Sequence, residues 1–186
     1  MYPFGMKTPS KFPKWYEPTP ELDTPRFMLA DVATAVNLVP GLVKTWISRG
    51  VIRLGFYDRE GRGAGSRHQF TLRRVICIAT TAELVALGVS PAKAGDLALN
   101  FTDVEHLEGR FVELPGRTYL IVEPHSEALI LATSGKTTFD QVLSRQLPSG
   151  DRAAQLPSGD RAASFAVVSG DAIKQRVASR LKERGG

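Results

Sequence analysis

The sequence of 186 residues predicts an α+β protein. Apolar residues recur at helical spacing on both sides of Pro40, and three short apolar stretches alternate with turn residues between 110 and 133. Six of the twelve prolines lie within residues 1–26, where regular structure is disfavoured. The expected organisation is a Pro-rich arm over 1–26, a helical unit over 27–99 and a small α+β unit over 100–186.

The prolines of the arm fix φ and remove backbone donors, so residues 1–26 are expected to be extended and without regular structure. The arm carries five aromatic residues, which are Tyr2, Phe4, Phe12, Trp15 and Tyr16. This aromatic content favours docking onto the body of the protein over full disorder.

Two short helices are predicted around Pro40. The apolar positions of the first are Leu29, Val32, Ala33 and Val36, and those of the second are Leu42, Val43, Trp46 and Ile47. Pro40 suits the first position of a helix, where its missing N–H costs nothing, and Gly50 suits a helix end. With the tight turn Asn37-Leu38-Val39 between them, the two helices form a helix-turn-helix outline.

The following segment predicts a two-stranded hairpin with a basic loop. Residues 51–57 and 67–70 are expected to be its strands, and the loop between them contains Gly61, Gly63 and Gly65 among arginines. Thr71 is expected to cap a buried helix over about 72–87, and Ser90-Pro91 is expected to start another.

Beyond residue 100 the pattern predicts short elements that need a packing partner. Strands are expected over 110–114, 118–122, 127–133 and 164–168, short helices over 102–107 and 139–143, and a final helix capped by Asp171. A nine-residue sequence occurs twice in succession over 146–163, which we interpret as a duplicated surface loop.

The net charge of +5 is concentrated in one segment. Residues 27–95 contain nine Lys/Arg and four Asp/Glu, whereas residues 1–26 contain four and three, and residues 96–186 contain eleven and twelve. A basic field focused in this way suits a polyanion, although an ordinary solvated surface gives the same count.

Residues 29–95 resemble the DNA-binding domain of the MerR-like winged-helix family. The resemblance is carried in order by Val32-Ala33, Leu38-Val39-Pro40, Val43-Lys44, Trp46, Gly50-Val51-Ile52, Phe70-Thr71 and the stretch 84–90. It implies a winged helix-turn-helix that binds double-stranded DNA as a dimer. Val39 stands where the family usually has Ser, Lys44 where it has Arg, and His68 at or beside the usual wing arginine. The long dimer helix and the metal-sensing cysteines of some members are not visible, so the resemblance does not extend to metal sensing or promoter untwisting.

The helix that starts at Pro40 is the expected recognition helix, and its first turns would face the major groove. Lys44 and Arg49 are the candidates for contact with base edges. The arginines at 53, 59, 62 and 67 suit phosphates, which fix register without reading sequence. The complete set of candidate DNA-binding residues is Gly41, Lys44, Thr45, Ser48, Arg49, Arg53, Arg59, Arg62, Arg67 and His68.

Other chemistry has little support in the sequence. The three histidines, His68, His106 and His125, are scattered, so neither a metal site nor a cofactor is expected. Cys77 is the only cysteine and is expected to be a core residue in a reducing compartment. No signal peptide or membrane span is visible, so a cytoplasmic protein is expected.

The function predicted from the sequence is therefore a sequence-specific DNA-binding transcriptional regulator, not an enzyme. The C-terminal unit would form the homodimer or receive a signal from a protein or small-molecule effector. Two alternatives remain open at this point: an architectural or recombination accessory protein that bends DNA, and an antitoxin-like module that binds a protein partner through residues 100–186.

Overall fold

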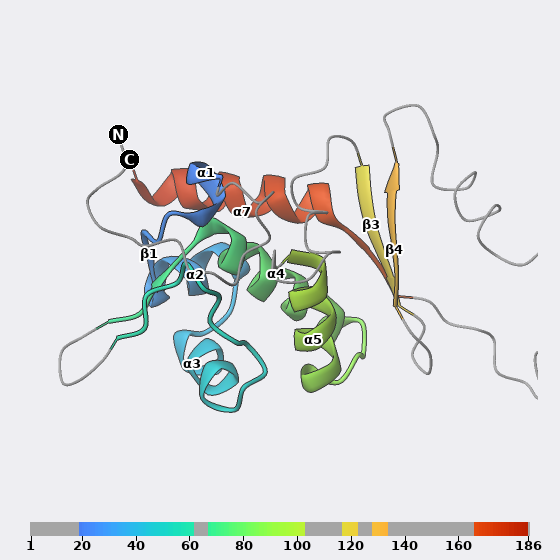
Figure 1. Ribbon diagram of the computed structural model, residues 1–186, viewed down its shortest axis with the longest axis horizontal. Helices are drawn as coiled ribbons and strands as arrows, with labels where there is room; N and C mark the ends of the chain where they lie inside the picture. The colour runs from blue at the N-terminus through green and yellow to red at the C-terminus, as the bar shows by residue number, and fades with distance from the viewer. Residues whose placement is uncertain (1–18, 62–66, 103–116, 123–127, 134–165, 186) are drawn as a thin grey trace, which may run out of the picture.

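The computed structural model describes residues 19–61, 67–102, 117–122, 128–133 and 166–185, and these form an α+β structure (Figure 1). Its helices are α1 (Pro20–Asp23), α2 (Leu29–Val36), α3 (Pro40–Ser48), α4 (Leu72–Ala86), α5 (Pro91–Thr102) and α7 (Gly170–Gly185). Its strands are β1 (Phe27–Met28), β2 (Gln69–Phe70), β3 (Arg117–Val122), β4 (Ala128–Thr133) and β5 (Ala166–Ser169). The helix α3 and the helix α7 lie on opposite sides of α2 and α4 (Figure 1).

The predicted pair of helices around Pro40 is confirmed. Asp31 starts α2 by accepting a hydrogen bond from the Met28 N–H (2.8 Å). Asn37 ends it in the left-handed conformation (φ 57°), which this residue type tolerates better than most. The turn is closed by the Leu38 N–H, which donates to the Ala33 carbonyl (2.9 Å), and α3 then starts at Pro40 as expected.

The predicted strand over residues 51–57 is wrong. Among the described residues, β2 instead pairs in antiparallel fashion with β1, and Arg59 forms an isolated bridge with Gln69. The reason is a side-chain carboxylate: Asp58 accepts a hydrogen bond from the Gly55 N–H (2.6 Å) and folds residues 55–58 into a turn. Only residues 59–61 remain to face 67–70, so the hairpin is shorter than expected, and its loop over 62–66 lies outside the described residues.

The two central helices follow the sequence pattern closely. The Thr71 side chain caps α4 by accepting a hydrogen bond from the Arg74 N–H (3.1 Å), as predicted. The helix α5 begins at Pro91 and packs along α4. Its Gly95 approaches the segment after α3 so closely that an added Cβ atom would lie 2.1 Å from the Val51 carbonyl oxygen.

In the C-terminal part, the three described strands form an antiparallel sheet in the order β4-β3-β5. The prediction that Asp171 caps the final helix is wrong, because the hydroxyl of Ser169 accepts the hydrogen bond from the Ala172 N–H (3.3 Å). The Asp171 carboxylate instead accepts from the Thr118 N–H of β3 (2.8 Å) and so ties α7 to the sheet. The expected elements over 110–114 and 139–143, the helix residues beyond 102 and the repeat over 146–163 lie outside the described residues.

The described residues of the two predicted units share one hydrophobic core. Its buried cluster extends from Val32 on α2 to Val177 on α7. Two side chains of α7 also bind this core: Arg180 donates to the Ala35 carbonyl of α2 (3.1 Å), and Arg176 forms an ion pair with Glu83 of α4. The described residues on both sides of residue 100 therefore pack against one another, and the division into two units stays a prediction.

The described end of the arm is docked and partly helical. Residues 20–23 form one helical turn, which corrects the expectation that the arm over 1–26 has no regular structure; residues 1–18 lie outside the described part. The Asp23 carboxylate accepts a hydrogen bond from Nε of Arg73 on α4 (2.7 Å), and both side chains are buried. A buried charge needs such a partner, so this ion pair fixes the end of the arm to the core.

No helix within the described ranges is both long enough and apolar enough to cross a membrane.

Gly95→Ala should lower the free energy of unfolding by about 1–3 kcal/mol, because the new methyl group overlaps backbone that cannot rotate away. Thermal or urea unfolding measures the change. Gly41→Ala is the matched control, since an added Cβ at Gly41 meets nothing within 4 Å and alanine favours a helix by up to about 1 kcal/mol. Equal stability of Gly95→Ala and the parent chain would contradict the close approach.

Candidate nucleic-acid interface

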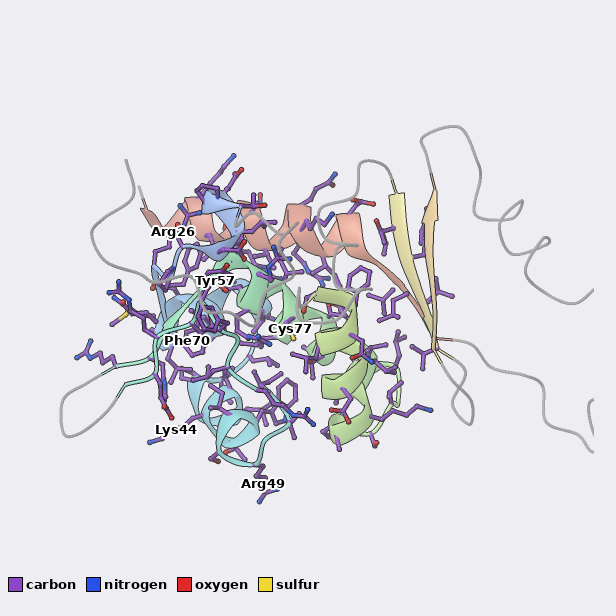
Figure 2. All side chains as sticks on the ribbon, viewed as in Figure 1. Arg26, Lys44, Arg49, Tyr57, Phe70 and Cys77 are labelled. Atoms are coloured by element: carbon purple, nitrogen blue, oxygen red, sulfur yellow. The ribbon has the colours of Figure 1, made fainter. Side chains whose placement is uncertain are left out.

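The helix α3 is held to the core by one side and presents the other to solvent. Val43 is fully buried and Trp46 is 6% exposed, which confirms the expectation that the tryptophan packs. At about 100° per residue, Gly41, Thr45 and Ser48 line the centre of the opposite side. Exposed Lys44 and Arg49 flank this stripe, and both point away from the helices that form the core (Figure 2).

The two hydroxyl groups on this face are oriented by the helix backbone. Thr45 Oγ1 donates to the Gly41 carbonyl (2.8 Å), and Ser48 Oγ donates to the Thr45 carbonyl (3.0 Å). The hydroxyl protons are therefore engaged, and the oxygen lone pairs face outward as acceptors. With a glycine beside them, these short side chains leave the middle of the face flat between the two cations.

The short hairpin stands beside α3 (Figure 1). Arg59 and Gln69 exchange backbone hydrogen bonds of 2.9 Å in both directions, and the side chains of Arg59 and Arg67 are exposed. The Gly61 N–H donates to Nδ1 of His68 (3.2 Å). His68 thus helps to close the hairpin, and Arg62 lies outside the described residues.

A groove of about 780 Å³ separates the end of α3 from the base of the hairpin. It is lined by Ile47, Gly50, Ile52, Arg53, Leu54, Gly55, Asp58, Arg59 and Glu60. Arg53 is already engaged: its Nη2 lies 2.9 Å from Oδ1 of Asp96 on α5, and both side chains are more than 60% exposed. Arg53, a predicted DNA contact, is therefore paired with an intramolecular acid in the described structure.

The carboxylate of Asp58 joins the hairpin to α4. Besides the Gly55 N–H, it accepts hydrogen bonds from the N–H and hydroxyl of Thr71 (2.8 and 3.0 Å) and from Nε of Arg74 (2.9 Å). The side chains of Asp58 and Arg74 are 1% and 3% exposed. Because four donors converge on one buried carboxylate, the start of the hairpin has little freedom to turn relative to α4.

Sequence analysis missed this ion pair and counted its arginine as surface charge. Arg73 and Arg74 are buried beside Asp23 and Asp58, so neither contributes to an outer basic face. Setting aside the two arginines and Asp58, residues 27–95 retain seven bases and three acids, a surplus of four. The partners are separated by 16 and 50 residues, and no local pattern marks such a pairing.

Two exposed apolar side chains at the start of α3 were not predicted as part of the site. Val39 is 67% exposed and Leu42 is 36% exposed. Val39 is the residue before the first turn, and Leu42 lies on the side of the helix that also carries Arg49. Sequence analysis gave Leu42 as an apolar position at helical spacing, and only the packing of α3 on α2 shows that its side chain is exposed.

In the part of the chain that the structure describes, no three His, Cys, Asp or Glu residues lie close enough together to bind a metal ion. Cys77 is buried, as expected, and Nη1 of Arg74 lies 3.5 Å from its sulfur. No protein-family model and no curated protein matches this sequence.

Asp58→Ala should destabilise the protein by about 3–5 kcal/mol, because it leaves the buried guanidinium of Arg74 without its carboxylate. Asp96→Ala is the matched control, since it removes the acid of an exposed pair and should cost no more than about 1 kcal/mol. Urea unfolding of both variants gives the comparison. Similar losses for the two would mean that Asp58 does not hold the hairpin as described.

Proposed function

We propose that this protein is a sequence-specific DNA-binding regulator of transcription, of the MerR-like winged helix-turn-helix type. The observation that carries the proposal is the outer face of α3, where Lys44 and Arg49 flank a flat, polar stripe beside an arginine-bearing hairpin. The resemblance over residues 29–95 supports the same function, and α2, α3 and the hairpin occur in the order that it implies.

The shape of α3 suits the major groove, which is wide enough to admit one helix. Short side chains in the middle of the face let the helix approach the base edges closely. Lys44 and Arg49 can then donate to guanine O6 and N7 from the two margins, and the oxygens of Thr45 and Ser48 can accept from base amino groups.

The hairpin supplies contacts of a different kind. Arg59 and Arg67 are exposed on a backbone held by paired hydrogen bonds, so they can meet phosphates at a fixed distance from α3. Charge at these positions raises affinity for every sequence. Specificity then depends on α3, and the buried Asp58 contacts hold the base of the hairpin on α4.

One recognition helix covers few base pairs, so two copies on a partly palindromic site complete the proposal. Residues 100–186 would form the dimer or receive the effector signal, and occupancy of the site would control a nearby promoter. An architectural role differs in its outcome: the protein would bend DNA without an effect on transcription.

Lys44→Ala and Arg49→Ala should each cost about 1–3 kcal/mol in binding to the cognate duplex and much less on a scrambled duplex. Arg59→Ala and Arg67→Ala should weaken binding to both duplexes alike, because a phosphate contact is independent of sequence. Gel-shift titration measures the four variants on duplexes recovered by selection from a random pool.

Lys182→Ala is the control for this series, since Lys182 is an exposed lysine on α7, away from α3. It should leave both affinities unchanged. Equal losses on cognate and scrambled duplexes for all four interface variants would refute the division between base and phosphate contacts.

Affinity for duplex DNA should fall steeply with salt. If four to six phosphates are neutralised, log K should decrease with log salt concentration at a slope of about −4 to −5. Anisotropy titrations at several salt concentrations give the slope. A slope near zero, or no binding in dilute buffer, would refute the proposed function.

A further inference from the structure

The exposed ion pair between Arg53 and Asp96 lies at the edge of the groove beside α3. Arg53 lines this groove, whereas Asp96 belongs to α5, which packs against the segment that follows α3. The two residues are 43 positions apart in sequence, so only the packing of α5 brings them together.

Whether Arg53 is paired determines the net charge of the described residues that line the groove. Asp58 is neutralised by buried Arg74, which leaves Arg53 and Arg59 facing the opposite charge of Glu60. While Arg53 is paired with Asp96, the charges of Arg59 and Glu60 balance. Once Arg53 is released, the groove carries a net positive charge next to the face that we assign to DNA.

We propose that this groove binds a phosphodiester group of DNA through Arg53. In the DNA-free protein, Asp96 forms an ion pair with this arginine. The carboxylate is an intramolecular competitor of a DNA phosphate: both offer paired oxygens to the same guanidinium fork. The inference rests on the proposed function and adds to it a contact that limits affinity for DNA.

The relative strengths of the two pairings favour exchange when DNA is present. Exposed ion pairs stabilise proteins by only about 0.2–1 kcal/mol, which corresponds to a factor of about 1.4 to 5 in an equilibrium. A phosphate in a duplex adds the release of a condensed counterion, which the internal carboxylate does not. Asp96 therefore lowers the affinity for all sequences by a small factor and leaves the preference for one sequence intact.

The position of Asp96 is set by tight packing. Its neighbour Gly95 lies against the Val51 carbonyl, two residues before Arg53, so α5 has no room to slide. At the other end of α5, Phe101 packs against Gly170 at the start of α7, where an added Cβ would lie 2.8 Å from the ring. The helix that carries the competing acid is thus in contact with the C-terminal part of the chain.

Asp96→Asn tests the inference on the full chain. It should tighten binding to a labelled random-sequence duplex at low salt by about two- to fivefold, because Arg53 no longer has to leave a carboxylate. Glu183→Gln makes the same change of net charge at an exposed position on α7 and should have a much smaller effect. Both variants should remain folded, with at most a small decrease in unfolding temperature, since neither side chain is buried.

A double-mutant cycle with Arg53→Ala separates the pair from general charge. In the Arg53→Ala background, Asp96→Asn should lose most of its effect, because there is no guanidinium to release. If Asp96→Asn tightens binding equally in the parent and Arg53→Ala backgrounds, or does not tighten it in the parent background, the inference is overturned while DNA binding stays in place. Absence of duplex binding by the parent chain would overturn the proposed function together with it.

Discussion

The arrangement of the proposed interface depends on one buried carboxylate. Asp58 collects hydrogen bonds from Gly55, Thr71 and Arg74, and in doing so joins the turn after α3, the base of the hairpin and the first turn of α4. Each of these donors would be costly to leave unsatisfied. The hairpin and the turn after α3 are therefore attached to the same end of one central helix, whereas α3 itself packs on α2.

Two adjacent arginines give α4 its role as the centre of the fold. Arg74 reaches Asp58 on the side of the hairpin, whereas Arg73 reaches Asp23 and the Thr102 carbonyl on the side of the arm and α5. Neighbouring residues of a helix point about 100° apart, so these two arginines can bind partners on two different sides of α4. Both guanidinium groups are buried in ion pairs, so the outer basic face consists of other residues.

The basic face is accordingly smaller than the sequence count implies and more closely balanced. Lys44 and Arg49 are held apart on α3, while Arg59 and Arg67 belong to the hairpin. Arg53 lies between these groups and is paired with Asp96. A surface of this kind combines cations that are open to solvent with one, Arg53, that is paired with an acid because of the placement of α5.

Local patterns determined most of the secondary structure. Apolar spacing together with Pro40 and Thr71 predicted α2, α3 and α4, because helix ends and helix faces depend on neighbours within four residues. The exposed candidates on α3 also followed from that spacing. Only the tertiary structure decided that residues 51–57 form no strand, that Ser169 caps α7, that Arg73 and Arg74 are buried and that Asp96 meets Arg53. These outcomes depend on partners that are distant in sequence, or on whether a side chain binds a local or a distant group. Packing of the whole chain determines which partner it binds.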